Sequence, residues 1–334
     1  MMNDDLFLSS DLLTDDLAEN CRTLLDQQWK TWELLRRNYT SLDSVETKTF
    51  ELDGTTVRVQ HNPARIASTA ARVDDEAIRA RPCFLCVQNL PPEQRAIAYG
   101  AEFVFLCNPY PIFPEHFTIS HREHVPQRIE PALPVLLQMS RGLEGEYVVL
   151  YNGPRCGASA PDHLHLQTGN SGFLPLEESY ERLVTDAGEK VAGRGGVLVF
   201  AVRAGGRRFL VIEADEMDEA AAACRSVLRA LSEMTSTDEE PMVNLVSWFE
   251  DGEWKVVVFP RARHRPSCYF EEEPRRLVVS PAAVDLSGVV ITPRSDDFHR
   301  ITKDDVRAIF EEVLLPPQVF DHLAVRVKAN IERS

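Results

Sequence analysis

The order of predicted strands and helices occurs twice along the sequence, and this repeat constrains the fold more than any other feature. The first set comprises two strands, a helix and two more strands, at 103–107, 116–120, 131–144, 147–152 and 163–168. The second set has the same order, at 197–203, 207–213, 215–234, 243–249 and 253–260. Short apolar or alternating runs indicate the strands, and longer amphipathic runs indicate the helices. A repeated β-β-α-β-β order predicts an α+β fold of two similar lobes, whose antiparallel strands can form one extended sheet.

Segments on either side of the repeat are predicted to pack against the two lobes. We expect an amphipathic helix at 10–38 with Ser10 as its cap, a hairpin at 47–60 with Asp53-Gly54 as its turn, and helices near 302–314 and 317–330. The Gly- and Arg-rich stretch 188–196 is the expected join between the lobes. The predicted domains are therefore an N-terminal lobe with a helical extension, 1–187, and a C-terminal repeat lobe, 188–334.

Two histidines of the first lobe follow directly after a loop of small residues. The apolar run 147–152 leads into the loop 153–162, which is rich in glycine, proline, alanine and serine. Such a loop lets backbone N–H groups approach an anion closely and cradle it. Polar and apolar residues then alternate, so His163, His165 and Gln167 are predicted to share one face of a strand beside that loop.

Two other interpretations of these histidines are open at this point. They can be the solvated polar face of a strand, although strand alternation, loop composition and residue types together disfavour that interpretation. His-x-His is also a common spacing of metal ligands, so a metal-only site is the second alternative.

The stretch resembles the active-site strand of the histidine-triad-like nucleotidyltransferases, a superfamily that includes galactose-1-phosphate uridylyltransferases, diadenosine tetraphosphate phosphorylases and GDP-galactose phosphorylases. Their pattern is His-x-His-x-Gln after a Gly/Ser-rich loop, which His163, His165 and Gln167 match. Residues 108–120 are also similar to the upstream strand pair of the diadenosine tetraphosphate phosphorylases. One departure is Asp162, which stands between a proline and His163, whereas in uridylyltransferases the proline directly precedes the first histidine.

The resemblance implies that catalysis belongs to the first lobe. His165 would be the nucleophile, and Gln167 would donate a hydrogen bond to the transferred phosphoryl group. Hydrolytic histidine-triad enzymes have a third histidine in place of this glutamine, so the resemblance favours transfer over hydrolysis. Further substrate contacts are expected from the loop and from nearby polar residues: Asn152, Gly157, Ser159, Arg65 and Asn108. For Arg65 a solvated loop position is the other interpretation.

The second lobe has Lys255 in the strand that corresponds to the histidine strand, and it is therefore expected to be non-catalytic. The block 260–266 that follows is rich in basic side chains. Arg261, His264 and Arg265 are candidates to reach across to distal phosphates or to a phosphate acceptor. The alternative is a solvated basic loop.

Cys83 and Cys86 form a Cys-x-x-Cys pair, which can be half of a zinc site, a redox pair or two unrelated thiols. The pair lies in a proline-rich loop, which disfavours the redox interpretation. In uridylyltransferases an upstream Cys-x-x-Cys binds zinc together with two histidines, one of them the first of the His-x-His pair. The resemblance thus implies a structural zinc ion held by Cys83, Cys86, His163 and one further histidine. We favour His124 for that position, with His116 as runner-up and His121 as a third candidate.

Composition and charge narrow the classes of partner and location. The formal charge of −16 argues against general nucleic-acid binding, which favours a basic face. No apolar run approaches the roughly 20 residues of a membrane span, and the N-terminus is acidic where a signal peptide is basic. Seven cysteines with one close pair do not suggest a disulfide framework. We therefore expect a cytoplasmic protein with no nucleic-acid or membrane partner, for which a homodimer is open.

The resemblance, together with the residues that carry it, implies a nucleotidyltransferase of the phosphorylase type. Its substrate would be a dinucleoside polyphosphate or an NDP-sugar, with a covalent nucleotidyl-histidine intermediate and a phosphate-bearing acceptor. The alternatives are a non-catalytic nucleotide sensor that keeps the pocket, and a metal-dependent phosphohydrolase that uses the histidines as ligands. The sequence does not indicate which nucleobase, sugar or acceptor is bound.

Overall fold

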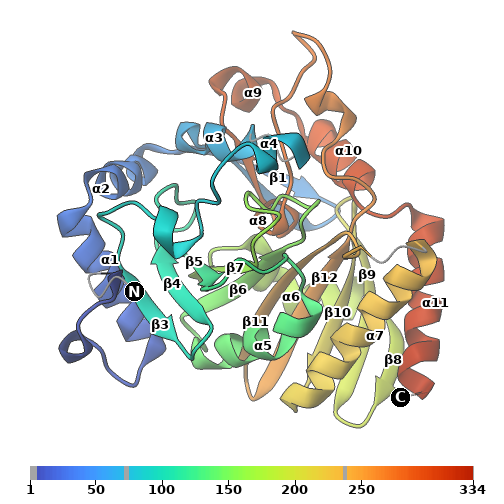
Figure 1. The fold of residues 1–334 in the computed structure, drawn as a ribbon. Helices are drawn as coiled ribbons and strands as arrows, with labels where there is room; N and C mark the ends of the chain where they lie inside the picture. The colour runs from blue at the N-terminus through green and yellow to red at the C-terminus, as the bar shows by residue number, and fades with distance from the viewer. Residues whose placement is uncertain (1–5, 71–74, 236–238, 334) are drawn as a thin grey trace.

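A computed structural model describes residues 6–70, 75–235 and 239–333, and its centre is a ten-stranded antiparallel sheet (Figure 1). The strand order is β3-β4-β5-β7-β6-β11-β12-β10-β9-β8. The first half contains β3 (Ala96–Tyr99), β4 (Phe103–Cys107), β5 (His116–His121), β7 (His165–Asn170) and β6 (Tyr147–Asn152). The second half contains β11 (Val243–Glu250), β12 (Glu253–Pro260), β10 (Arg207–Ala214), β9 (Val197–Ala204) and β8 (Gly188–Arg194). The predicted α+β fold class is confirmed.

The two halves have the same strand order about the central pair β6 and β11. These two strands pair in antiparallel register from Asn152 with Asn244 to Val149 with Ser247. One extended antiparallel sheet therefore forms, as the repeat predicted. The stretch 188–196, expected to join the two lobes, is itself regular structure. Most of it forms the edge strand β8, which pairs with β9.

One face of the sheet is covered mainly by α-helices. These are α1 (Leu17–Thr31), α2 (Glu33–Thr40), α5 (Leu133–Gly142), α7 (Met217–Thr235) and α11 (Pro317–Arg333). Helix α1 contacts β3 and β4, α5 contacts β11, and α7 contacts β10. Apolar side chains such as Leu24, Leu137 and Leu228 bury this interface in one continuous cluster, which makes the sheet and its helices a single core.

The opposite face carries the second layer, which combines helices with a small sheet. The helices are α6 (Pro175–Ala187), α8 (Ala283–Leu286), α9 (Ser295–Arg300) and α10 (Lys303–Val313). The small sheet consists of β1 (Glu46–Leu52), β2 (Thr55–His61) and β13 (Val289–Thr292). Because β13 pairs with β2, the C-terminal segment is tied to the N-terminal hairpin on the face that also carries the site described below.

Local predictions differ from the structure mainly at element boundaries. The N-terminal helix begins at Leu17, where the Asp16 side chain accepts from the Glu19 N–H, so Ser10 is not its cap. It breaks at Trp32, whose extended φ of −120° and ψ of 101° separate α1 from α2. The predicted hairpin turn is present, with positive φ at Asp53 (49°) and Gly54 (75°).

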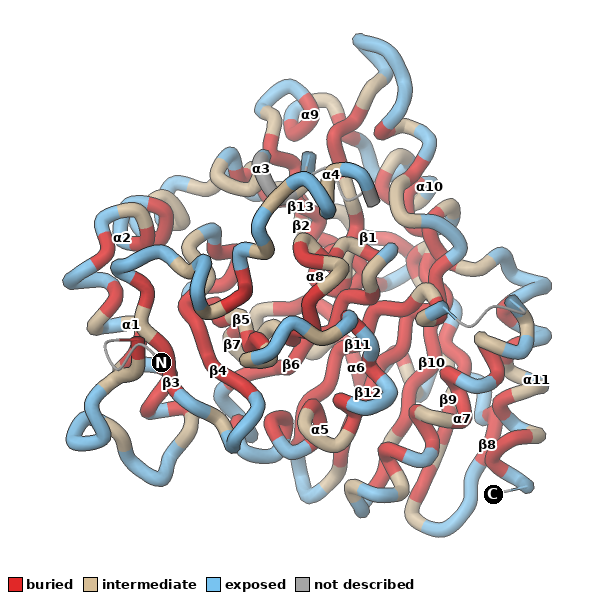
Figure 2. The backbone as a smooth tube through the Cα atoms, in the orientation of Figure 1, coloured by how far each residue is buried: buried red, intermediate tan, exposed pale blue. Residues whose placement is uncertain are grey.

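Burial follows the sheet. Every residue of β6 is buried, because both of its faces are covered. Figure 2 shows that the central strands are buried along most of their length, whereas helix exteriors and connecting loops are exposed. Among the described residues, no helix combines the length and apolar composition needed to cross a membrane.

Candidate active site and metal centre

The loop between β6 and β7 is held in place by close backbone contacts. Gly157 has a φ of +95°, and a Cβ at this position would lie 2.7 Å from the Cβ of Ala282. A side chain is therefore excluded both by the backbone conformation and by the neighbouring segment. This explains why the loop needs glycine here, and it places Gly157 beside the C-terminal half of the chain.

Side chains from outside the loop fix its carbonyl groups. The Asn244 amide donates to the Cys156 carbonyl at 2.7 Å, and the Arg81 guanidinium donates to the Ser159 carbonyl at 2.8 Å. Asn244 comes from β11 in the second half of the sheet, and Arg81 comes from the segment before the cysteine pair. The loop is thus fixed from two directions, in a conformation that holds Gly157 beside the polar residues described below.

His165 is the first residue of β7, and its side chain is set up as a neutral imidazole. It is 3% exposed, and burial lowers its pKa to about 4. Its Nδ1 lies 2.8 Å from the His163 carbonyl oxygen, so Nδ1 carries the hydrogen and donates it. Nε2 then holds the lone pair, and no hydrogen bond to it is present within the described residues. An imidazole of this tautomer is a competent nucleophile at neutral pH.

His163 does not extend the row of side chains that the alternation predicted. Strand β7 begins at His165, and His163 lies in a bend just before it. Its ring lies with Cys83 and Cys86, while His165 and Gln167 line a common cavity. The predicted strand therefore starts two residues too early. The last residues of the loop form a turn and a bend, and pairing with β5 begins only at His165.

A mostly apolar cavity of about 360 Å³ opens beside His165 and Gln167. Its walls come from α2, from the cysteine-pair segment and from the β4–β5 connection. The apolar lining includes Trp32, Leu34, Phe84, Leu85, Leu90, Leu106 and Tyr110. Asn108 also lines it, and its side-chain oxygen accepts from the Tyr110 N–H at 3.0 Å. A cavity of this size with aromatic and aliphatic walls suits a planar, largely apolar ring system.

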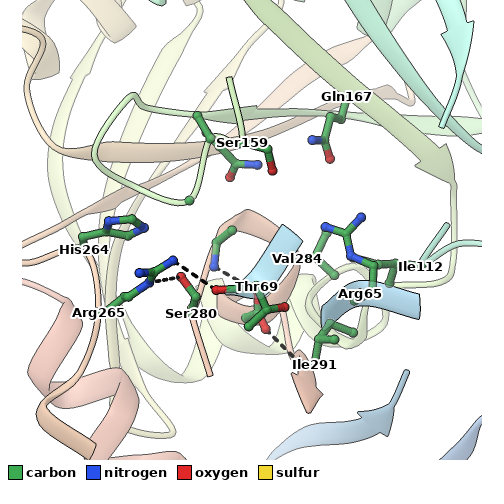
Figure 3. Close-up of a pocket in the computed structure, with 15 residues that line it drawn as sticks. Arg65, Thr69, Ile112, Ser159, Gln167, His264, Arg265, Ser280, Val284 and Ile291 are labelled. Atoms are coloured by element: carbon green, nitrogen blue, oxygen red, sulfur yellow. Dashed lines mark hydrogen bonds between the residues drawn. The ribbon is translucent and has the colours of Figure 1, made fainter. Parts of the chain in front are cut away.

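A smaller polar cavity of about 50 Å³ meets the apolar one, and Arg65, Ser159 and Gln167 line both. Figure 3 shows His264 and Arg265 on one side of this cavity and Arg65 on the other. Burial lowers the pKa of Arg65 to about 10, so its guanidinium is still charged at neutral pH. The cavity therefore offers positive charge and hydroxyl groups to an anion.

The basic side chains around the polar cavity are themselves held by hydrogen bonds. Arg65 donates to the Tyr110 carbonyl at 2.7 Å. Arg265 donates to Ser280 Oγ at 3.1 Å and to the Thr69 carbonyl at 3.0 Å, and it lies over the Tyr269 ring. His264 is kept neutral, because burial and the adjacent Arg265 lower its pKa to about 4. The basic loop is thus folded against the cavity, and the solvated-loop interpretation does not apply to these two residues.

Arg261 has a different place from the one expected. It is 3% exposed, and its N–H groups donate to side-chain and backbone oxygens of the protein. The acceptors are Val313 O, Asn244 Oδ1, Pro281 O, Arg263 O and His264 O. Since a guanidinium has five N–H donors, no donor remains for a phosphate. The expectation of a direct substrate contact is therefore corrected: Arg261 folds the basic loop around itself.

Asn152 is likewise tied into the protein. Its side-chain oxygen accepts from Asn244 at 2.7 Å and from the Ala283 N–H at 2.9 Å, while the residue also lines the polar cavity. Asn152 and Asn244 are directly paired residues of β6 and β11, so the two halves of the sheet share one polar network beneath the loop.

Cys83, Cys86, His124 and His163 form a compact cluster whose ligand atoms lie within 4.8 Å of one another. The Nδ1 atom of His163 lies 3.3 Å from Cys83 Sγ, and the Nδ1 atom of His124 lies 3.2 Å from Cys86 Sγ. Two ligand atoms on a tetrahedral zinc ion with ordinary Zn–S and Zn–N bonds are about 3.6 Å apart. The donor set and its spacing therefore fit a closed metal site of the Cys₂His₂ type.

The outer nitrogens of the two histidines have partners suited to metal ligands. His163 Nε2 lies 2.7 Å from the His121 carbonyl oxygen, so it donates there and leaves Nδ1 for the cluster. His124 Nε2 lies 3.4 Å from a carboxylate oxygen of Asp162. The residue that departs from the uridylyltransferase motif thus lies behind a candidate ligand, where a carboxylate orients the ring.

The structure chooses among the candidate histidines. His124 belongs to the cluster, whereas His116 lies beside Gln167, and the Nδ1 atom of His121 lies 3.0 Å from the backbone of Glu123. Several residues that line the cavities were not predicted from the sequence, among them Arg81, Ser280 and Asp285. Arg81 stands two residues before Cys83 and could have been noted for that reason. Ser280 and Asp285 have no local signal, because a distant segment brings them to the site.

Comparisons with known proteins agree with this architecture. Residues 24–170 match a family described as "Domain of unknown function (DUF4922)", and residues 180–334 match "GDPGP1-like, C-terminal domain". No curated protein sequence matches the chain.

Solved structures match over most of the chain at low identity. Yeast Ap4A phosphorylase Apa2 in complex with Ap4A is 16% identical, with a TM-score of 0.58, over 89% of this chain and 98% of that chain. The same yeast enzyme without that ligand is 16% identical, with a TM-score of 0.52, over 85% and 97%. An ADP-glucose phosphorylase from Arabidopsis thaliana aligns more loosely, at 13% identity and a TM-score of 0.39, over 81% and 99%. The chain therefore has the fold of yeast Ap4A phosphorylase, and its C-terminal part matches the GDPGP1-like family, in agreement with the resemblance to histidine-triad-like nucleotidyltransferases.

Proposed function

We propose that this protein is a nucleotidyltransferase of the phosphorylase type, which acts through a covalent nucleotidyl intermediate on His165. The observation that carries the proposal is the neutral His165 imidazole, with its Nδ1 hydrogen donated to the His163 carbonyl, where a nucleoside-sized apolar cavity meets a basic polar one. The likeness to yeast Ap4A phosphorylase supports a nucleotide substrate for the same fold.

In the first step the substrate is a dinucleoside polyphosphate or an NDP-sugar. Its base and ribose occupy the apolar cavity, and its α-phosphate lies at the junction beside His165 and Gln167. Nε2 attacks the α-phosphorus, an N–P bond forms, and the P–O bond to the leaving phosphate breaks with its electron pair. Gln167 donates to a non-bridging oxygen, and N–H groups near Gly157 and Ser159 stabilise the charge that develops there.

In the second step a phosphate-bearing acceptor takes the nucleotidyl group. An oxygen of the acceptor attacks the same phosphorus, a P–O bond forms, and the N–P bond breaks to return neutral His165. The polar cavity, with Arg65, His264 and Arg265 around it, is the place for that acceptor or for the distal phosphates. Its volume of about 50 Å³ favours a small anion such as inorganic phosphate.

The metal cluster supports this geometry from outside the reaction centre. A zinc ion bound by Cys83, Cys86, His124 and His163 would be structural, because four protein ligands leave it no open position for substrate. His163 connects the cluster to catalysis, since its own carbonyl accepts the Nδ1 hydrogen of His165. This arrangement disfavours a metal-dependent phosphohydrolase.

The test is to incubate the protein with α-³²P-labelled Ap4A, GDP-sugars and ADP-sugars, and then to map any acid-labile label to a peptide. We expect label on His165, released as a nucleoside diphosphate when inorganic phosphate is added. Nucleotide binding without any adduct would indicate a nucleotide sensor instead, and label on another residue would reject the mechanism.

A further inference from the structure

We infer that His116 is a positioning residue, which fixes the orientation of the Gln167 carboxamide so that its NH₂ group faces the phosphoryl site. The inference rests on the proposed function, because it assigns a role to a neighbour of Gln167. The metal cluster does not include His116, so its ring nitrogens are not used as metal ligands there.

The hydrogen bonds around His116 determine its tautomer. The Ile112 N–H donates to Nδ1 of His116 at 3.2 Å, so Nδ1 carries no hydrogen. In a neutral imidazole the hydrogen must then be on Nε2. Nε2 lies 3.2 Å from Oε1 of Gln167, so His116 donates and the carboxamide oxygen accepts.

The ring of His116 is fixed on its other sides. It is fully buried, with the Phe113 ring edge-to-face at a centroid distance of 5.2 Å. Phe113 in turn lies over Gly169, where a Cβ would come within 2.2 Å of that ring. The Tyr39 hydroxyl donates to the backbone carbonyl of His116 at 2.9 Å. His116 is thus a rigid donor built into β5, the neighbour of β7.

The charge state of His116 agrees with this assignment. Burial and the nearby Arg65 lower its pKa to about 3, so the ring is neutral at physiological pH. It can therefore donate through Nε2 only, and it adds no positive charge next to the reacting phosphate.

A carboxamide has one donor end and one acceptor end. With Oε1 held by His116, the NH₂ end of Gln167 is directed to the other side, where both cavities meet. Rotation by about 180° would present oxygen lone pairs to an anionic phosphoryl group, which is repulsive. His116 prevents that rotation before substrate arrives, which is the preorganisation that electrostatic catalysis requires.

The experiment compares His116→Phe, which keeps a ring of similar size but has no donor, with His116→Gln, whose amide places an N–H near the former Nε2. Single-turnover formation of the nucleotidyl-histidine is measured with labelled substrate, together with KM and thermal stability. We expect the rate to fall about tenfold to hundredfold in His116→Phe with KM little changed, and to recover largely in His116→Gln. His116→Asn, which is too short to reach Gln167, replaces His116→Phe if that variant does not fold.

A double-mutant cycle separates positioning from a general structural effect. If His116 acts through Gln167, His116→Phe should cause no further loss of rate in a Gln167→Ala background. An equal loss in both backgrounds, or an unchanged rate in His116→Phe, would overturn the inference. Absence of any adduct in the unaltered protein would instead refute the proposed function.

Discussion

The two halves of the sheet offer an internal comparison, because β7 and β12 occupy equivalent positions on either side of the central strands. Gln167 of β7 lies opposite Leu150, and Lys255 of β12 lies opposite Trp248, so all four side chains share the second face of the sheet. The first half has a neutral imidazole and a carboxamide beside a cavity. The second half has a buried ammonium group in a packed environment.

The positive charge of Lys255 is balanced by two carboxylates, and its side chain is enclosed by neighbouring residues. Its Nζ lies 3.0 Å from carboxylate oxygens of both Glu181 and Glu250 and 4.9 Å from the centre of the Tyr180 ring. Helix α6 supplies two of these partners, Tyr180 and Glu181, and it packs against β8 and β9 of the second half.

The difference teaches that one strand order can support either a reaction centre or a packed core, depending on what covers it. The second half nevertheless contributes to the site, because Asn244 and Arg261 hold the loop and the walls of the polar cavity. In the proposed mechanism it forms a wall of the active site, and the reactive groups all come from the first half.

The largest effect is expected at the nucleophile. His165→Gly should abolish the covalent adduct and lower turnover by several orders of magnitude, because a missing nucleophile cannot be replaced by neighbouring groups. Added imidazole should restore part of the rate by filling the space left by the side chain. Full activity in His165→Gly would remove the functional contrast between the two halves.

The metal cluster provides the second test, since its ligands belong to the first half alone. We expect elemental analysis to find about one zinc ion per chain, and Cys86→Ser to lose that ion together with several kcal/mol of stability. Cys224→Ser is the matched control, because Cys224 is a buried cysteine of α7 outside the cluster. Equal metal content in both variants would show that the cluster does not bind zinc.

The contribution of the second half can be measured at the basic loop. Arg265→Ala should raise the KM for phosphate about tenfold, because it removes a charged donor from the polar cavity. Arg263→Ala in the same loop is the control, since that side chain is 54% exposed and pairs with Glu312 on the surface. If both variants have unchanged kinetics, the second half only encloses the site.

Lowering the pH should reduce the stability of the folded protein through His116 of the first half. The folded pKa of about 3 lies below the ordinary value of 6.5, so between these values the unfolded state binds a proton that the folded state does not. Stability should therefore fall as pH decreases below 6.5, with a slope of about 1.4 kcal/mol per pH unit from this residue. Urea unfolding of the unaltered protein and His116→Phe at pH 6 and pH 5 measures the difference, and equal slopes would contradict it.

The smallest effect is expected at Lys255. Lys255→Met keeps an unbranched side chain that is one atom shorter, and it leaves two glutamates that are 79% and 56% exposed, so their charges return to water. Adduct formation should stay within about twofold, and the loss of stability should be about 1 kcal/mol. A marked loss of adduct in this variant would mean that the second half takes part in the chemistry.

The sequence by itself determined the features that depend only on residues close together in the chain. Strand alternation, turn residues and the repeated order of elements predicted the α+β fold, the hairpin at Asp53-Gly54 and the extended sheet. The prediction for His165 and Gln167 needed only the local motif and the resemblance that it carries. Cys83 and Cys86 could be paired with His163 for the same reason, although the choice of His124 over His116 was open.

The tertiary structure decided which side chains meet across the sheet and which are satisfied before a substrate arrives. His116 reaches Gln167 because β5 pairs with β7, and that register is set by packing that no short stretch of sequence records. Arg261 looks like a phosphate ligand in sequence, but five oxygens, two from its own loop and three from distant segments, accept its N–H groups. Hydrogen bonding is directional and short-ranged, so the role of a buried polar group depends on partners that only the complete fold brings within about 3 Å.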